Sequence, residues 1–338
     1  MILVTGGTGL VGSHLLYELV KSGKVVRALK RKTSSIENVK KVFSYYTTDA
    51  ELINKIDWVE GDVLDISSLL TAMEAVEIVY HCAAMVSFEK KHLIEMMQVN
   101  VEGTANVVNT ALEKKIKKMC YVSSIATLQK TNNTKFIAEE FIWKFSPDLS
   151  NYAISKYQAE REVWRASEEG LAVIIVNPSV IVGGGNWSSS SANMFSKAFN
   201  GLKFYTDGAT GFIDVRDVAT LMVNLTESTI KNERFILNSE NGTYRYFFNL
   251  IHDSFEKTRP HIKAGKFLSS VAWRMENISC LITGNSPLIT KETARSAHHI
   301  NYFSNHKILQ TFPDYQFIGL RDSINHTCNL FLKEVKAL

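Results

Sequence analysis

A glycine-rich turn between the first apolar run and the first helical segment constrains the fold of this sequence more than any other feature. The run Ile2–Val4 is followed by TGGTGLVG over residues 5–12, after which apolar residues recur at helical spacing. Gly6 permits a tight turn, Gly9 lets an anion approach the backbone, and Gly12 lets the helix pack closely on the strand. The free N–H groups at the start of a helix favour a pyrophosphate at such a turn. A purely structural turn is the alternative, but the strand–turn–helix context predicts a dinucleotide site whose contacts include Gly6, Thr8, Gly9, Leu10, Val11 and Gly12.

The N-terminal half of the chain alternates short apolar runs with amphipathic segments. We expect strands at Ile2–Val4, Val25–Leu29, Ile56–Val59, Ile78–Tyr80, Met119–Val122 and Val173–Val176. Helical stretches lie between them, notably Leu93–Glu113 and Tyr152–Glu169. Strand–helix alternation with right-handed crossovers predicts an α/β protein with a Rossmann-type, doubly wound parallel sheet.

The alternation weakens after Pro178, where glycine- and serine-rich stretches precede irregular, aromatic-rich segments. We therefore expect a smaller C-terminal lobe that binds the substrate. Residues 1–177 are assigned to the nucleotide-binding core, to which residues 210–238 and 301–338 return, and residues 178–209 and 239–300 form the lobe. Two further helices are expected, at Phe267–Leu281 and Leu320–Lys333. Contact of the first with a membrane is the alternative, but Arg274 and Glu276 favour an ordinary helix of the lobe.

Composition and charge argue against several classes of protein. The chain is 45% hydrophobic and 21% charged, as globular proteins are. Its net charge of +4 is spread along the sequence, so no nucleic-acid partner is expected. The four cysteines have no metal-like spacing with histidine, which predicts no metal and buried free thiols in a reducing cytoplasm. No apolar stretch of about 18 residues predicts a transmembrane segment, and no secretory leader is expected.

The end of the second expected strand bears on the identity of the dinucleotide. An acidic residue that accepts from the ribose 2′-hydroxyl of NAD usually stands there, whereas this chain reads RALKRK over residues 27–32. A guanidinium binds a 2′-phosphate in a bidentate manner, and a carboxylate repels it. We therefore predict NADP(H) in preference to NAD(H), with Arg31 as the main phosphate contact and Lys32 and Ser34 as helpers. A solvated basic loop beside bound NAD is the alternative.

Tyr152 and Lys156 stand four residues apart in the segment NYAISK, so they share one face of a helix. A free tyrosine has a pKa of about 10 and is a poor acid–base catalyst at neutral pH. A nearby ammonium favours the phenolate and lowers that pKa. Such pairs are common on surface helices, but this one follows the fifth expected strand and a phosphate turn. We therefore predict that Tyr152 and Lys156 are catalytic and also contact the cofactor.

Two serines end the fifth expected strand, at the sheet edge where ligands of such folds bind. The hydroxyl of Ser124 is placed to donate to a substrate carbonyl and polarise it. Ser123 is its neighbour, and the alternative is that one of the two serines merely caps a turn. We assign the catalytic role to Ser124.

These motifs together resemble the extended short-chain dehydrogenase/reductases over nearly the whole chain. The resemblance is strongest to the dihydroflavonol-reductase and 3β-hydroxysteroid-dehydrogenase branch. It rests on the segments TGGTGLVG, VRALKR, GDVLD, HCAA, VNVEGTANV, YVSSIA, YAISK, NPSVIVGGG and FIDVRDVA, and on Tyr302–Lys307.

The resemblance implies roles for further residues. Asp62 and Val63 would contact the adenine, and the small residues Ala83 and Ala84 would line the cofactor groove. Asn100 would support the catalytic set. Pro178 and Val180 would border the nicotinamide. The alternatives are that Asp62 is a turn residue and that Asn100 caps or kinks its helix. The resemblance also implies a homodimer, in which Leu93–Glu113 and Tyr152–Glu169 pair with their mates in a four-helix bundle.

The expected activity is reduction of a ketone or aldehyde to an alcohol, or the reverse, with a hydride from the nicotinamide and a proton from Tyr152. A nucleotide-sugar epimerase or dehydratase on the same fold is the first alternative. Dehydratases of the family carry an Asp-Glu pair beside the catalytic residue, and epimerases often continue Ser-Ala-x-x-Tyr-Gly. Ser124 is followed here by IATLQ, which favours the reductase. A non-catalytic NADP-sensing protein is the second alternative, although such proteins typically lose the Tyr/Lys pair.

The substrate pocket is expected to draw on residues 85–88, the stretch after Ser124 and the loop 183–204. Apolar and aromatic residues are frequent in these segments, which favours a hydrophobic small molecule over a charged sugar nucleotide. Packing of the lobe is the alternative role of these residues. The predicted substrate contacts are Val86, Ser87, Ser124 and Tyr152.

Overall fold

The computed structural model describes residues 1–338 except 131–133, 142, 266–272, 275–289 and 338. The expected helix Phe267–Leu281 therefore lies outside the described residues, apart from Trp273 and Arg274. The strands are β1 (Ile2–Thr5), β2 (Val26–Lys30), β3 (Ile56–Glu60), β4 (Ile78–His81), β5 (Lys118–Val122), β6 (Phe136–Ile137), β7 (Ala172–Pro178), β8 (Val180–Val182), β9 (Phe204–Tyr205), β10 (Ala209–Asp214), β11 (Glu233–Leu237), β12 (Glu240–Thr243), β13 (Ile262–Lys263) and β14 (Tyr302–Phe303).

The helices are α1 (Leu10–Lys21), α2 (Glu37–Ser44), α3 (Ile66–Ala72), α4 (Leu93–Met97), α5 (Gly103–Glu113), α6 (Asn151–Glu168), α7 (Asn193–Phe199), α8 (Val215–Glu227), α9 (Tyr244–Ser254), α11 (Lys291–Ser296), α12 (His306–Thr311) and α13 (Leu320–Ala337). Short 3-10 turns cover Ala50–Lys55, Lys90–His92, Ile125–Thr127 and Ser190–Ala192, and a π-helical turn covers Gln98–Glu102.

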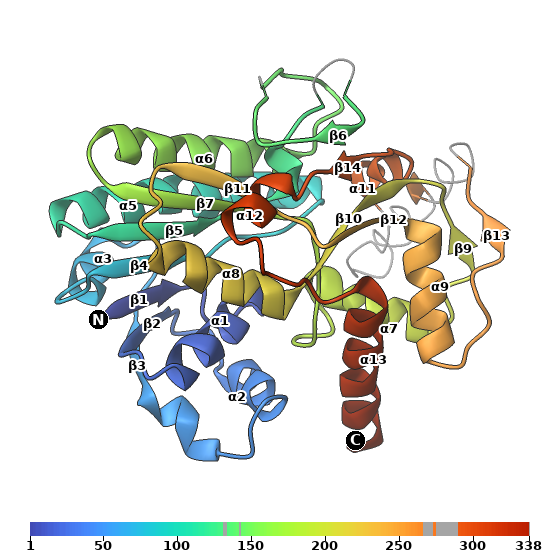
Figure 1. Cartoon of the computed structure of the whole chain (residues 1–338), viewed down its shortest axis with the longest axis horizontal. Coiled ribbons are helices and arrows are strands. Elements are labelled where there is room, and N and C mark those ends of the chain that lie inside the picture. Colours follow the sequence, from blue (N-terminus) through green and yellow to red (C-terminus); the bar gives the residue numbers. More distant parts are fainter. Residues whose placement is uncertain (131–133, 142, 266–272, 275–289, 338) are drawn as a thin grey trace.

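Seven parallel strands form the central sheet, in the order β11-β7-β5-β4-β1-β2-β3 (Figure 1). All six strands expected from the sequence belong to it. The seventh, β11, extends the sheet beside β7, with Phe235 opposite Val176. The strand order reverses between β1 and β4, and the carboxyl ends at such a switch point are where ligands of open α/β sheets bind.

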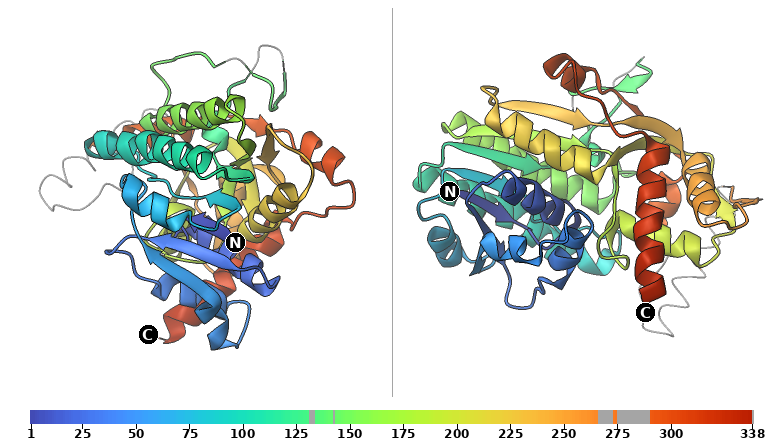
Figure 2. Two further views of the ribbon diagram at one scale, coloured as in Figure 1. Left: turned by 90° about the vertical axis from the view of Figure 1, so that its left-hand side faces the viewer. Right: turned by 60° about the horizontal axis from the view of Figure 1, so that its bottom comes forward.

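Helices cover both faces of this sheet (Figures 1 and 2). Helices α1, α2 and α8 pack together on one face, and α3, α5 and α6 on the other. Side chains of a strand alternate between the two faces, so Ile2 and Val4 join the core under α1 while Leu3 joins the core under α5 and α6. The predicted doubly wound α/β fold is confirmed.

A smaller three-stranded sheet, in the order β12-β10-β8, lies beyond the carboxyl ends of the main strands. It packs with α7, α9 and α13 around a separate apolar cluster, in which the rings of Phe212 and Phe247 stack 4.7 Å apart. The division into core and lobe stays a prediction, but α13 departs from it. We expected residues 301–338 to return to the core, yet α13 packs on α9 and β10 because Leu320, Ile324 and Phe331 face this cluster.

The expected helix Leu93–Glu113 is interrupted. It consists of α4, the π-helical turn and α5, and Asn100 lies in the π-helical turn. Such turns occur mainly at functional sites. Asn100 uses its side chain to bind the backbone of Met85, so the local change of pitch brings this helix against the segment after β4.

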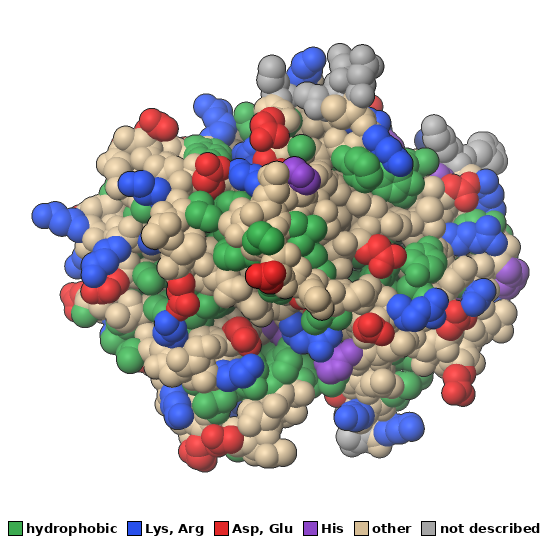
Figure 3. All heavy atoms as spheres, viewed as in Figure 1, with side chains coloured by type: hydrophobic (Ala, Val, Ile, Leu, Met, Phe, Trp, Pro, Cys, Tyr) green, Lys and Arg blue, Asp and Glu red, His purple; other side chains and the backbone are tan. Residues whose placement is uncertain are grey.

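The described residues also bear on the other sequence expectations. Cys82, Cys120 and Cys328 are free thiols, and burial raises the pKa of each; Cys280 lies outside the described residues. Over the described ranges, no three His, Cys, Asp or Glu side chains gather closely enough to bind a metal, and no helix is both long and apolar enough to cross a membrane. Basic and acidic side chains are interspersed on the face drawn in Figure 3.

Candidate active site

The glycine turn leaves the start of α1 open for an anion. Gly6 has a φ of +68°, and a side chain there would bring its Cβ within 2.5 Å of the backbone nitrogen of Ala83. A Cβ at Gly12 would overlap the carbonyl oxygen of Gly6. Gly9 caps α1 without a side-chain hydrogen bond, and the first turn holds no acidic residue. The first N–H groups of α1 are therefore available to a pyrophosphate.

A cavity of about 350 Å³ adjoins this turn. Its walls come from the turn itself, from the segment after β2 and from the loop after β8: Thr8, Gly9, Leu10, Ser34, Ser35, Glu37, Asn38, Asn186, Ser189 and Ala192. Asn38 ties two of these segments together by donating to the carbonyl of Thr8 at 3.3 Å. A turn that tolerates no side chain and a polar cavity beside open N–H groups both fit a dinucleotide.

Arg31 and Lys32 follow β2 and are exposed, and neither lines this cavity. Ser34 does line it. So does Glu37, a carboxylate that the sequence expectation did not include, although Lys40 pairs with it at 2.7 Å. The preference for NADP(H) accordingly stays a prediction.

The other predicted cofactor contacts lie along the carboxyl edge of the sheet. Asp62 follows β3 and accepts from the backbone of Leu64, so its side chain forms a turn. The side chain of Val63 is buried in the core, which leaves only its backbone to meet an adenine. Ala83 approaches Gly6, while Ala84 is exposed.

Tyr152 and Lys156 both lie on α6, whose start is capped by Ser150. Ser124, two residues after β5, lies close enough to Tyr152 for its side chain to lower the pKa of the phenol, and the ring of Phe88 meets that of Tyr152 edge-on at 5.7 Å. The two serines at the end of β5 have different partners, because Ser123 donates to Glu160 at 2.6 Å. Ser124 is therefore the serine that faces Tyr152, and it also caps the following turn by accepting from Ala126.

Lys156 is buried, with only 2% of its surface exposed. Its ammonium donates to the carbonyl of Val122 at 2.7 Å and lies 4.5 Å above the centre of the Tyr121 ring. Burial lowers the pKa of Lys156 to about 7. Burial raises the pKa of Tyr152, against the opposing effect of the Ser124 side chain. From the sequence we expected Lys156 to lower the pKa of Tyr152. In the structure the ammonium of Lys156 is directed at the carbonyl of Val122 and does not lower that pKa.

Asn100 is buried and its side chain is fully used. It accepts from the nitrogen of Met85 at 2.7 Å, and it donates to the carbonyl of Met85 at 2.9 Å and to Ser155 at 3.0 Å. Asn100 lies in the π-helical turn and binds Ser155, the residue before Lys156; its role in the catalytic set stays a prediction.

The remaining predicted residues lie on the segment after β4 and where β7 is followed by β8. Val86 is exposed, and Ser87 is buried and lies 2.9 Å from the imidazole of His92. Pro178 ends β7, and Val180 begins β8 on the edge of the lobe cluster. The structure thus places a glycine turn and a Ser-Tyr-Lys set at one edge of one parallel sheet.

The profile of the NAD dependent epimerase/dehydratase family matches residues 2–237, which include both the turn and this set. The chain belongs to this family. Its members of the extended short-chain dehydrogenase/reductase type are oxidoreductases that use a nicotinamide cofactor.

Three relatives of this family illustrate the relationship. A putative dihydroflavonol 4-reductase of Synechocystis sp. is 31% identical over 70% of this chain and 67% of its own length. Sterol demethylase protein B of Methylococcus capsulatus is 27% identical over 89% of this chain and 86% of its own length. The crystal structure of gox2253 superposes with a TM-score of 0.80 at 27% identity and covers 99% of this chain and 98% of that one. Within the family, the chain is an NAD(P)-dependent reductase of the branch that includes the dihydroflavonol and cinnamoyl-CoA reductases.

Sequence reasoning missed several residues of this family member's site. Tyr121, which lies under Lys156, was read only as part of a strand. Asn38 and Ser35, which line the cavity, follow no recognised motif. Glu160 could have been found, because it lies four residues after Lys156 and eight after Tyr152 and is therefore a charged residue on the same buried face.

The depressed pKa of Lys156 predicts a pH dependence of stability. Its pKa is about 7 when folded and about 10.5 when unfolded, so between these values the unfolded chain binds more protons. The free energy of unfolding should therefore rise with pH from 7 toward 10 by at most about 1.4 kcal/mol per pH unit relative to Lys156→Met. Urea denaturation without cofactor measures it. Lys21→Met, at an exposed lysine, should keep the wild-type slope. Equal slopes in the wild type and Lys156→Met would contradict the burial of a titrating ammonium.

Proposed function

We propose that the protein reduces the carbonyl group of a small apolar compound with NADPH. The observation that carries this proposal is that Ser124, after β5, and Tyr152, on α6, are neighbours at the sheet edge beside the glycine turn, where the Ser124 side chain lowers the pKa of the Tyr152 phenol. In the proposed reaction one carbonyl oxygen accepts from both hydroxyls. Phe88 packs edge-on against Tyr152 and supplies an apolar wall next to that oxygen.

The reaction then needs one hydride and one proton. When bound, the nicotinamide supplies a hydride to the carbonyl carbon. Ser124 donates to the carbonyl oxygen and polarises the double bond. Tyr152 passes its phenolic proton to the same oxygen, which completes the alcohol, and solvent later returns a proton to the phenolate. For Lys156 to stabilise the phenolate in this interval, its ammonium must turn from the carbonyl of Val122 toward Tyr152, since only a nearby ammonium favours the charged form.

The preference for NADP(H) rests on the charge after β2. Arg31 and Lys32 are exposed, and in the described part of the chain neither side chain makes a hydrogen bond or ion pair. Ser34, three residues on, already lines the cavity next to the turn. Both cations are therefore available to a 2′-phosphate. Glu37 repels such a phosphate less strongly than an unpaired carboxylate would, because Lys40 forms an ion pair with it.

An apolar substrate is supported by the residues around Tyr152 and by the relatives. Val86 and Phe88 lie on the segment after β4, and Phe88 packs against Tyr152. Val86 is 48% exposed, so its apolar side chain is accessible to a substrate. The names of two relatives refer to a dihydroflavonol and a sterol. We assign the binding of the substrate to these residues and to the smaller lobe.

The protein is further proposed to form a homodimer through α4, α5 and α6. Helices α5 and α6 pack side by side on the outside of the sheet (Figure 2). Leu93 and Ile94, at the start of α4, are 38% and 74% exposed. Exposed apolar side chains next to a helix pair suit a four-helix interface.

Replacement of Tyr152 by phenylalanine removes the proposed proton donor and keeps the ring that packs on Phe88. Carbonyl reduction should lose at least about 100-fold in kcat, the usual contribution of a general acid, while the Kd for NADPH stays unchanged. Steady-state kinetics and fluorescence titration measure the two. Tyr246→Phe, on α9, is the matched control and should behave as the wild type. Survival of turnover in Tyr152→Phe would disprove the assignment of this residue.

Replacement of Arg31 by alanine tests the cofactor preference. Loss of a charge-assisted contact to the 2′-phosphate should lower kcat/KM for NADPH about 10- to 100-fold and leave that for NADH nearly unchanged. The ratio of the two constants is the measurement. Arg259→Ala, at an exposed arginine after α9, should not alter it. A wild-type enzyme that favours NADH would refute the preference outright.

A further inference from the structure

One buried carboxylate next to the catalytic residues has no part in the proposed reaction. Glu160 lies on α6, one turn beyond Lys156, and is 1% exposed. An isolated buried carboxylate is costly, so its partners must compensate it. On one oxygen it accepts from Ser123 at 2.6 Å and from Asn177 at 3.1 Å, and the hydroxyl of Thr127 lies 3.3 Å away.

These three partners all adjoin Ser124. Ser123 precedes it at the end of β5, and Thr127 ends the turn that Ser124 begins. The carbonyl of Ser124 accepts from Thr127 at 2.9 Å and from Asn177, the residue before the end of β7, at 3.1 Å. Glu160 thus binds the groups that hold the backbone of Ser124 from both sides.

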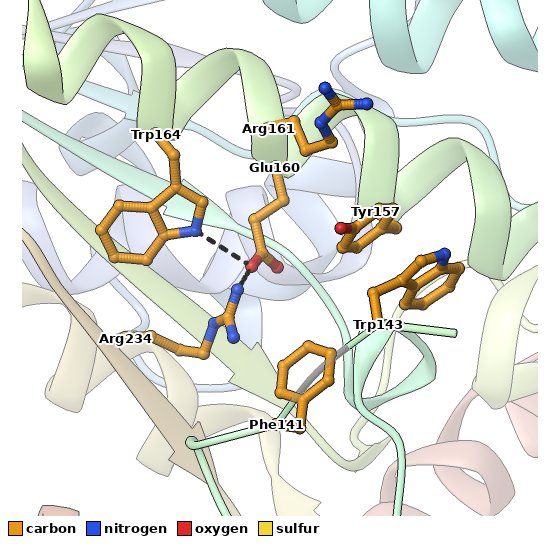
Figure 4. A pocket seen from close by; sticks show the side chains of 7 residues that line it. All are labelled: Phe141, Trp143, Tyr157, Glu160, Arg161, Trp164 and Arg234. Carbon is orange, nitrogen blue, oxygen red and sulfur yellow. Dashed lines mark hydrogen bonds and ion pairs between the residues drawn. The ribbon is translucent and has the colours of Figure 1, made fainter. Parts of the chain in front are cut away.

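An arginine from the edge of the sheet neutralises the other oxygen of Glu160. Arg234, on β11, forms an ion pair with it, and Trp164 donates to the same oxygen at 3.3 Å (Figure 4). The guanidinium lies 4.9 Å from the centre of the Phe141 ring and 5.6 Å from that of Trp164. Rings on both sides favour a cation at this position.

A cavity of about 160 Å³ opens beside this ion pair and is lined by Phe141, Trp143, Tyr157, Glu160, Arg161, Trp164 and Arg234. The rings of Trp143 and Tyr157 stack 3.8 Å apart on its far side. Burial lowers the pKa of Arg234 only to about 10, so the arginine stays charged at neutral pH. The cation therefore lies between the Glu160 carboxylate and two aromatic rings.

We infer that Glu160, neutralised by Arg234, is a positioning residue that fixes the hydroxyl of Ser124 against that of Tyr152. Tyr152, Lys156 and Glu160 lie on one face of the same rigid helix, at intervals of four residues. Ser124 belongs to the strand side of the site. The carboxylate joins the two sides, so it sets the distance between the two hydroxyls that share the substrate oxygen. This inference rests on the proposed function.

The variant Glu160→Gln tests this inference. The amide keeps the shape of the side chain, but it replaces one acceptor oxygen by an NH₂ group, which would face the groups that now donate to Glu160. In carbonyl reduction, kcat should fall about 10- to 100-fold, as misplacement of a reacting group typically causes, with the KM and Kd for NADPH unchanged. The deuterium isotope effect with NADPH labelled at C4 of the nicotinamide should increase, since hydride transfer becomes more rate-limiting. Wild-type values of both kcat and the isotope effect would overturn the inference.

A second readout does not depend on turnover. The side chain of Ser124 lowers the pKa of Tyr152, so displacement of Ser124 from the phenol should raise that pKa. The other titratable neighbours, Lys156 and Tyr121, are unchanged in the variant. With 3-fluorotyrosine at position 152, the ¹⁹F titration of Glu160→Gln should move to higher pH than that of the parent. An identical titration would contradict the inference.

Two controls separate positioning from stability. Asp217→Asn alters an equally buried carboxylate on α8, on the opposite face of the sheet, where it accepts from Tyr315 at 2.8 Å and from Ile318 at 3.0 Å. It should lose stability but keep kcat and the titration; an equal loss of kcat would overturn the inference. The double variant Glu160→Gln/Arg234→Met removes both charges and so leaves no buried charge without a partner. It replaces Glu160→Gln if that single variant does not fold, and it should show the same loss of kcat.

These results also distinguish the two proposals. A wild-type enzyme that reduces no carbonyl compound refutes the proposed function, and a shifted titration in Glu160→Gln would still establish that Glu160 holds Ser124 on Tyr152. Active wild-type enzyme with an unaffected Glu160→Gln refutes only the positioning role.

Discussion

Two buried charges on one helix, the ammonium of Lys156 and the carboxylate of Glu160, determine how the catalytic helix meets the sheet. Each charge is stable inside the protein only with specific partners. Lys156 donates to the carbonyl of Val122 at the end of β5. Glu160 accepts from Ser123, which follows β5, and from Asn177, near the end of β7. The helix is therefore docked on the carboxyl ends of two neighbouring strands by polar contacts as well as by apolar packing, and Tyr152 and Ser124 meet where this docking ends.

The proposed cofactor site lies at the same edge of the same sheet. The glycine turn after β1 brings the start of α1 to the switch point, and the backbone of Ala83 closes against Gly6 because no side chain separates them. The smaller lobe completes the cavity and is tied to the core through Glu334 on α13. This carboxylate accepts from Tyr45 at 2.5 Å and from Trp187 at 2.7 Å, and Lys41 pairs with it at 3.0 Å. Core and lobe thus share the walls of the cavity beside the glycine turn.

Much of this arrangement could be predicted from the sequence because it is local. Six strands and the glycine turn follow from apolar runs and spacing, and the pair Tyr152–Lys156 follows from helical periodicity. The missed features depend on contacts between distant segments. The direction of Lys156 depends on the carbonyl of Val122, 34 residues away, and Arg234 reaches Glu160 only because β11 returns beside β7. The amphipathic pattern of α13 predicted a helix but could not say which of two apolar clusters it would cover.

The central claim is that a hydride passes from the nicotinamide to a carbonyl carbon beside Tyr152 and stays in the product. The most direct measurement uses NADPH with deuterium at both hydrogen positions of C4 of the nicotinamide, with a panel of apolar aldehydes and ketones and with nucleotide sugars, and mass spectrometry of the products. The account predicts an alcohol that carries one deuterium on its carbinol carbon and one equivalent of NADP⁺ released per turnover. Epimerised or dehydrated sugars with no net oxidation of NADPH, or alcohols without deuterium, would contradict it.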